Sequence, residues 1–147
     1  MHTVLKGALA ALGTLALGVV VSGPALAQFG GPPPPPNTGV PLFTKMTGGS
    51  GEGRITVVVD PPKGTACYIM NVGALEGVTA AHIHIGGPGE TGRPVVPLDT
   101  PDGGTSGGCA PVAPELSAAL LANPGGYYVN VHTRQFPNGA IRGQLTK

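Results

Sequence analysis

The residues of this sequence best suited to chemistry are three histidines. In AAHIHI, His82 and His84 are separated by one residue, and His132 ends the run YYVNVH. Successive strand residues point to opposite faces, so two imidazoles at i and i+2 can reach the same ion. A third imidazole from another strand completes a three-nitrogen site, which suits Cu(II) or Zn(II). We therefore predict one copper or zinc ion at His82, His84 and His132.

The same histidines also have a plainer interpretation. Their ring nitrogens could hydrogen-bond to neighbouring strands and loops and bind no metal, and a His-x-His pair alone favours that alternative. Because the third histidine also lies on a polar face, the hypothesis of metal binding and the alternative without metal are equally supported. Because no carboxylate is clearly placed beside the histidines, Ca(II) and Mg(II) are disfavoured.

Two strands have to position these side chains. In the first, Ile83 and Ile85 alternate with the histidines, and in the second Val129 and Val131 take the same alternate positions. Apolar residues at every second position indicate the core face of a strand. We expect these four residues in the core and all three histidines exposed on the opposite face.

The last two strands are expected to form a hairpin around Phe136-Pro137-Asn138-Gly139. Proline, asparagine and then glycine fit a type I turn followed by a bulge. This turn would pair Phe136 with Ala140 and His132 with Gln144. The strand that follows alternates inward and outward residues, with Ile141 and Leu145 in the core and Arg142 and Gln144 outside.

The remaining sequence consists of short apolar runs separated by glycine and proline, which is typical of an all-β protein. One short helix is predicted over 113–122, opened by Pro114-Glu115 and ended by Asn123-Pro124. We expect an antiparallel β-sandwich, a Greek key of the immunoglobulin-like or superoxide-dismutase-like kind. The predicted strands are 54–59, 66–72, 80–85, 95–98, 127–134 and 140–145.

Three regions follow one another along the chain. Residues 1–27 have a basic start, an apolar stretch and an A-x-A site, which together define a secretory signal peptide. Residues 28–40 contain five consecutive prolines and are predicted to be an extended polyproline spacer. Residues 41–147 form the single β domain. The mature protein is therefore expected to be secreted or periplasmic, with no membrane span after cleavage.

Two cysteines, Cys67 and Cys109, lie in the exported part of the chain. Because that compartment is oxidising, we expect them to form a disulfide. The alternative, two free thiols or a thiolate metal pair, needs a reducing compartment.

The charge balance limits the partners. Removal of the leader takes away Lys6 and leaves seven basic against seven acidic side chains. Nucleic acids and anionic membranes both require a basic face, so neither is expected to bind. The predicted partner is a metal ion or an extracellular protein that the sequence does not identify.

Two blocks of the sequence resemble a known family. AAHIHIGGPGETGRPVVPL (80–98) and YYVNVHTRQFPNGAIRGQL (127–145) resemble the two hallmark blocks of the CHRD domain family, named for chordin. The resemblance covers about residues 53–147 and includes a Cys-Tyr strand before the blocks. It implies an all-β sandwich and an extracellular setting, but no particular biochemical activity.

A weaker resemblance is to copper-zinc superoxide dismutase, in which an H-x-H strand, a distant histidine, an arginine and a disulfide surround copper. It implies that Arg142 lies behind the metal ligands or guides an anion to the metal. That enzyme uses further histidines to build a copper-zinc pair. The mature chain has none left, so this dinuclear site is excluded.

We conclude from the sequence that this is an exported binding domain, more readily understood as non-enzymatic, with a three-histidine copper or zinc site. Ser106 stands in GTSGG (104–108), which matches G-x-S-x-G by letters, but this glycine-rich stretch is not expected to form the strand-to-helix elbow of a nucleophile. The first alternative is a copper-dependent oxidoreductase of the superoxide dismutase type. The second is a structural or adhesive extracellular module without a metal.

Overall fold

The structure is a computed structural model that describes residues 38–73 and 75–147. The predicted signal peptide and residues 28–37 of the predicted spacer lie outside the described residues. Besides three short 3-10 helices, the described part contains eight strands and one α-helix: β1 (Val40–Gly48), β2 (Gly51–Asp60), β3 (Thr65–Val72), β4 (Val78–Ile85), β5 (Pro94–Leu98), β6 (Thr105–Pro111), α1 (Pro114–Ala122), β7 (Tyr127–Thr133) and β8 (Ile141–Gln144).

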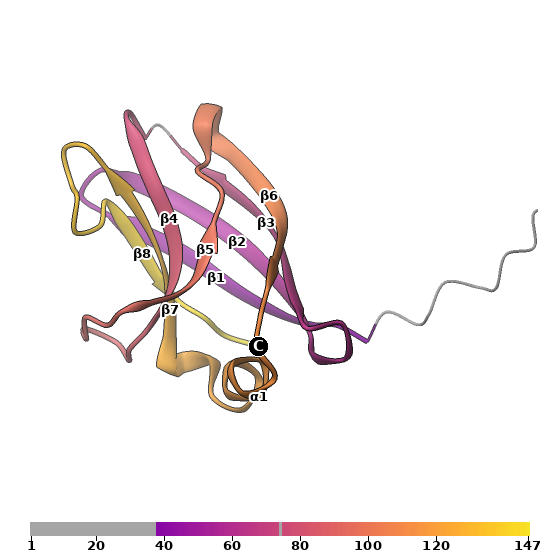
Figure 1. Cartoon of the computed structure of the whole chain (residues 1–147). Coiled ribbons are helices and arrows are strands. Elements are labelled where there is room, and N and C mark those ends of the chain that lie inside the picture. The colour runs from indigo at the N-terminus through magenta and orange to yellow at the C-terminus, as the bar shows by residue number, and fades with distance from the viewer. Residues whose placement is uncertain (1–37, 74) are drawn as a thin grey trace, which may run out of the picture. The chain divides into compact units, whose positions relative to one another are not determined.

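The eight strands form one continuous sheet in the order β5-β4-β7-β8-β1-β2-β3-β6. Every pairing is antiparallel. The two end strands, β5 and β6, contact each other, so the sheet curls almost into a closed barrel (Figure 1). The predicted all-β antiparallel class with one short helix is confirmed. The two facing layers of the predicted sandwich are parts of this single curled sheet.

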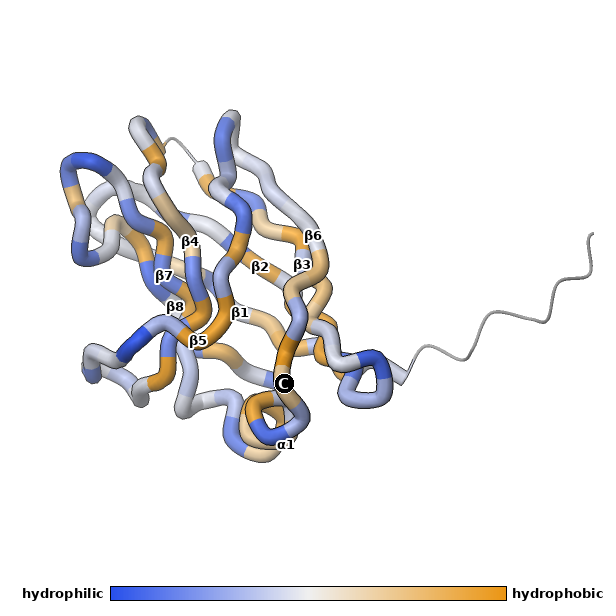
Figure 2. Tube along the Cα trace, in the orientation of Figure 1, coloured by the Kyte–Doolittle hydropathy of each residue, from blue (hydrophilic) through white to orange (hydrophobic). Residues whose placement is uncertain are grey.

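The core lies inside the curled sheet and is built by strand alternation. Fully buried side chains include Leu42, Val57, Met70 and Val129, one from each of four strands. On each strand, the neighbouring residues in sequence point to the outer face. Figure 2 shows the resulting alternation of apolar and polar positions along the strands. Helix α1 lies at one end of the barrel and adds Leu120 to the same core (Figure 1).

Two strands were not predicted from the sequence. β1 begins at Val40, the last residue assigned to the spacer, and it contains Pro41. Proline removes a backbone donor, but near the start of a strand that loss is tolerated. β6 is rich in glycine and carries little apolar signal, yet it pairs along its whole length with β3.

The β7–β8 hairpin is present, but its predicted register is wrong by four residues. Tyr128 pairs with Gln144, and Val131 pairs with Ile141. The turn itself forms, since the Gly139 N–H donates to the Phe136 carbonyl over 3.1 Å. The residues around this turn do not extend the ladder, because they fold back onto the outer face of β7.

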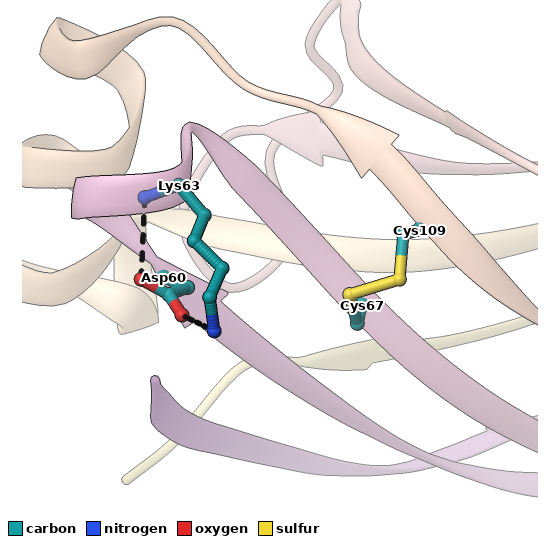
Figure 3. The surroundings of a disulfide bond; sticks show 4 residues. All are labelled: Asp60, Lys63, Cys67 and Cys109. Atoms are coloured by element: carbon teal, nitrogen blue, oxygen red, sulfur yellow. Dashed lines mark hydrogen bonds and ion pairs between the residues drawn. A yellow bond between two sulfur atoms is a disulfide. The ribbon is translucent and has the colours of Figure 1, made fainter. Parts of the chain in front are cut away.

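The predicted disulfide is confirmed. Cys67 on β3 and Cys109 on β6 are direct cross-strand partners with Cα atoms 3.9 Å apart, and their sulfurs are bonded (Figure 3). Close by, Asp60 ends β2 and accepts the backbone N–H of Lys63 over 3.3 Å. Its other oxygen lies 2.8 Å from the Lys63 ammonium (Figure 3). Together these contacts hold the outer strand β6 and the β2–β3 connection in place.

Candidate metal centre

Strands β4 and β7 lie side by side and bring the three histidines to one face. His84 lies opposite Tyr128, His82 opposite Asn130, and His132 opposite Ala80. The intervening residues on both strands are fully buried in the core: Ala81, Ile83, Val129 and Val131. The predicted outward direction of the histidines is therefore confirmed.

The three rings form a compact triangle. Their centroids are 5.5 Å apart for His82 and His84, 5.3 Å for His82 and His132, and 5.6 Å for His84 and His132. One ligand atom from each residue lies within 4.8 Å of the other two.

A metal ion would require these atoms to move slightly closer together. The centre of an equilateral triangle with 4.8 Å sides lies about 2.8 Å from each corner, against roughly 2.0 to 2.1 Å for a Zn–N bond. Nitrogens that share one metal ion at about 2.0 Å per bond lie roughly 3 to 4 Å apart, and the 4.8 Å limit is looser than that. Small ring movements of less than about 1 Å close the difference.

Two of the rings have a fixed orientation. The Nδ1 of His84 lies 2.9 Å from the carbonyl oxygen of Gly92, and the Nδ1 of His132 lies 2.9 Å from that of Pro137. A carbonyl oxygen only accepts, so each Nδ1 carries the hydrogen and donates it. In the neutral ring, Nε2 is then left with a free lone pair, which is the form that binds metals.

Three nitrogens of this cluster are buried without a hydrogen-bond partner: His82 Nδ1, His84 Nε2 and His132 Nε2. Buried polar atoms are almost always satisfied, because losing contact with water without replacement is costly. One unpartnered nitrogen could be an isolated defect. Three that belong to three neighbouring rings form a group that could hold a metal ion.

The histidines are less exposed than expected. His84 is buried, with 7 % of its surface exposed, and His82 and His132 are half-buried. Two loops account for the contacts that cover this face, since residues 86–93 supply the Gly92 carbonyl and residues 134–140 supply the Pro137 carbonyl.

Ile85 corrects another expectation, because it is 42 % exposed rather than in the core. The register between β4 and β5 shifts between Ile83 and His84, so the alternation that places Ile83 inside does not continue to the strand end. Ile85 instead lines a surface cleft beside α1.

The electrostatics of the cluster favour the uncharged rings. Burial lowers the pKa of His82 below its ordinary value of 6.5, and repulsion from His132 and His84 lowers it further. A protonated His82 would bring a positive charge into a poorly solvated site that also contains the other two imidazole rings. A neutral imidazole is what ligation requires.

Arg142 lies on β8, where it stacks on Tyr128 with its guanidinium carbon 3.6 Å from the ring centroid. It also donates to the Glu90 carbonyl over 2.8 Å. These contacts place Arg142 against the ring of Tyr128, on the strand next to β7. Its predicted role behind the ligands or in guiding anions stays a prediction.

Tyr128 is the residue of this site that the sequence analysis did not single out. Its ring stacks on that of His84, with centroids 5.0 Å apart and planes 15° apart. Its hydroxyl oxygen accepts the Gly92 N–H over 3.2 Å. Strand alternation could have found it, because Tyr128, Asn130 and His132 occupy every second position of one strand and so share a face.

Residues 32–145 match the CHRD domain family. The chain belongs to the CHRD domain family. The match includes both blocks that carry the resemblance, and with them all three histidines of the cluster.

Searches of curated proteins and of solved structures gave no significant match. Nothing in these comparisons supports the weaker resemblance to copper-zinc superoxide dismutase. Within the described residues, no helix combines the length and apolar character needed to cross a membrane.

Proposed function

We propose that this CHRD domain is an exported, non-enzymatic binding module that holds one Cu(II) or Zn(II) ion through His82, His84 and His132. The observation that carries the proposal is the set of three buried, unpartnered ring nitrogens on adjacent strands. A metal ion satisfies all three at once, since Nε2 of His84 and of His132 carries a lone pair and Nδ1 of His82 carries one when that ring has its hydrogen on Nε2.

The chemistry of the ligand set selects the metal. Three imidazole nitrogens suit zinc and copper, whereas calcium and magnesium prefer several oxygen ligands. In zinc proteins, a ligating histidine is oriented by an outer partner that accepts a hydrogen bond from its other ring nitrogen. In this chain the carbonyls of Gly92 and Pro137 would serve as these partners for His84 and His132. Three protein ligands also leave a position on the metal for water or for a group from a partner.

Export is the second part of the proposal. The leader-like residues 1–27 and the disulfide between Cys67 and Cys109 support an oxidising compartment. If the leader is cleaved after Ala27, the secreted protein begins at Gln28. The intact mass of secreted material tests this, and a mass that retains residues 1–27 would contradict it.

Calorimetric titration of the tag-free protein with Zn(II) and with Cu(II) at pH 7 tests the metal site. We expect one ion per chain for the wild type and no binding above background for the variant with His82→Ala, His84→Ala and His132→Ala. Circular dichroism of the variant checks that the β fold is retained. Equal metal uptake by the two proteins would overturn the proposal.

The copper-loaded protein also tests whether the module is non-enzymatic. We expect its superoxide turnover to be no greater than that of the triple variant mixed with the same amount of copper. Turnover well above that control would instead establish the oxidoreductase alternative.

A further inference from the structure

Tyr128 occupies the centre of a three-layer stack on the outer face of the sheet. On one side its ring lies against His84 of β4, and on the other side against the guanidinium of Arg142 of β8. Strand β7 runs between β4 and β8, so the two neighbours approach the ring from opposite directions. Tyr128 therefore connects a candidate metal ligand to a charged residue that itself lies outside the histidine cluster.

Tyr128 is also connected to His84 through the backbone. The Gly92 N–H donates to the Tyr128 hydroxyl, and the Gly92 carbonyl accepts from Nδ1 of His84. A side chain at Gly92 would collide with the carbonyl of Ile85, so the chain passes too close to β4 for any residue but glycine. One peptide segment is thus fixed from both sides, and it fixes the hydrogen-bonding direction of the His84 ring.

The loop that carries Gly92 is tied down by the C-terminal strand. Arg142 donates to the Glu90 carbonyl over 2.8 Å and lies 3.4 Å from the Gly87 carbonyl. Gln144 donates to the Gly86 carbonyl over 2.6 Å. The two side chains that β8 directs outward therefore hold residues 86–90 against the sheet.

We infer that Tyr128 and Arg142 are positioning residues of the histidine site, which hold His84 in the tautomer with hydrogen on Nδ1 and a free lone pair on Nε2. An isolated imidazole exchanges between two tautomers, and a fixed acceptor at Nδ1 selects the one with hydrogen on that nitrogen. In this chain the acceptor is the Gly92 carbonyl, and the position of that carbonyl depends on Tyr128 directly and on Arg142 through the loop. The inference rests on the proposed metal site.

The first experiment measures zinc affinity. Tyr128→Phe keeps the stack on His84 but removes the oxygen that accepts the Gly92 N–H. Loss of the outer partner of a metal-ligating histidine lowers affinity about 10- to 100-fold. Tyr128→Phe displaces that partner, the Gly92 carbonyl, without removing it, so we expect a decrease toward the lower end of that range.

The chain offers a closely matched control for Tyr128→Phe. The hydroxyl of Tyr68 accepts the Asp99 N–H over 2.6 Å, at a place in the fold that contains none of the three histidines. Tyr68→Phe therefore removes the same kind of hydrogen bond and is expected to leave zinc affinity unchanged.

The second experiment reads the tautomer directly in the metal-free protein. Long-range ¹H–¹⁵N correlation spectra distinguish a ring with hydrogen on Nδ1 from one with hydrogen on Nε2. In the wild type we expect both His84 and His132 to carry hydrogen on Nδ1. In Tyr128→Phe we expect His84 to become a mixture, while His132 stays unchanged because its acceptor belongs to Pro137.

Arg142→Lys separates the charge from the geometry of the guanidinium. Lysine keeps the positive charge but lacks the planar fork that reaches two acceptors and stacks on the ring. We expect Arg142→Lys to change both readouts in the same direction as Tyr128→Phe. The inference is overturned if the His84 tautomer in Tyr128→Phe matches the wild type, or if the wild type binds zinc and Tyr128→Phe binds it equally well.

Failure of the proposed function gives a different result. If the wild type binds no zinc while its His84 tautomer is fixed and shifts in Tyr128→Phe, the metal site fails and the positioning device stands. If the wild type binds zinc and Tyr128→Phe binds it equally well, the site stands and the positioning role fails.

Discussion

The imidazole of His132 and the carbonyl of Pro137 are joined by a 2.9 Å hydrogen bond between two points only five residues apart. The β7–β8 turn therefore folds back onto its own strand. His84 is oriented in the same way, but by the carbonyl of Gly92 in a different loop. Two loops thus fix two rings of one cluster independently, and a change in either loop should affect one ring at a time.

Gly139→Ala tests the loop that holds His132. Gly139 has a φ of 129°, and a side chain there would collide with the amide of Asn130. We expect a loss of about 1 to 3 kcal/mol in the free energy of unfolding, because a strained backbone and a clash add together. Zinc affinity should fall as well. Urea denaturation measures the stability.

Gly49→Ala is the control for this change. Gly49 lies in the β1–β2 turn, and a side chain there would meet nothing within 4 Å. The free energy of unfolding of Gly49→Ala is expected to stay close to that of the wild type. Equal losses of stability for the two variants would show that the positive φ and the clash at Gly139 do not cause the loss.

Val131→Ala and His132→Ala compare the two faces of one strand. Val131 is fully buried, so removing its methyl groups should cost about 1 to 3 kcal/mol in the free energy of unfolding. His132 faces away from the core, and its replacement opens no internal cavity. The His132→Ala fold is expected to stay intact, with a much smaller change in thermal stability. Equal destabilisation of the two would contradict the assignment of faces.

Strand alternation explains how much of the site the sequence predicted. The directions of the three histidines, of Val129 and of Val131 depend only on the two-residue period of a strand, which is local information. β1 carries the same signal in Leu42, Thr44 and Met46, which are buried at alternate positions. Proline at position 41 obscured it.

The remainder of the site depends on contacts that are distant in the sequence. The β7–β8 register was set by where the loop folds back, and neither the Gly92 nor the Pro137 carbonyl could be placed from residue type. Backbone carbonyls occur at every position and leave no sequence pattern. β6 could not be predicted for a related reason, since its position comes from pairing with β3 and from the disulfide at Cys109.

Removal of the disulfide should lower stability substantially. Cys67 and Cys109 are 42 positions apart, and closing a loop of that length is worth about 4 kcal/mol in the chain-entropy model. We expect the variant with Cys67→Ala and Cys109→Ala to lose about that much free energy of unfolding, measured by urea denaturation. An unchanged midpoint in this variant would show that the cross-link does not constrain the unfolded chain.

Asp60 should make stability depend on pH in the acid range. The hydrogen bond from Lys63 holds the pKa of Asp60 below its ordinary value of 3.8, and burial opposes this while Thr38 adds to it. Because the folded-state pKa is lowered, the stabilisation is present above about pH 3.8 and is lost as the pH falls through the folded-state pKa. Asp60→Asn should therefore be less stable than the wild type at pH 7, with the difference shrinking well below pH 3.8.

The control for Asp60 is an exposed ion pair on the same sheet. Glu52 lies 2.8 Å from Lys45, but both side chains are largely exposed. Exposed pairs contribute little to stability, so Glu52→Gln should change the denaturation midpoint only slightly. A constant difference between Asp60→Asn and the wild type at all pH values would show that ionisation of Asp60 is not the cause.

The metal-free domain should also lose stability below neutral pH because of His82. Burial, with repulsion from His132 and His84, lowers the pKa of His82 in the folded state below 6.5. As the pH falls below about 6.5, the unfolded chain therefore takes up a proton on His82 before the folded domain does, which favours unfolding. The loss continues until the folded-state pKa is reached. Well above pH 6.5 both states hold a neutral ring, so His82 contributes no pH dependence there.

His82→Leu provides the decisive comparison for this last effect. The substitution keeps a side chain of similar reach on β4 but removes the titrating ring, so the difference in the free energy of unfolding between it and the wild type should change as the pH falls below 6.5. Thermal unfolding of both metal-free proteins between pH 7.5 and the acid range, with a chelator present, measures that difference. If it stays constant across the range, His82 is not the group responsible. Added zinc should shift the wild-type transition upward at pH 7 and progressively less as acid competes for the ring nitrogens, because ligation requires neutral imidazoles.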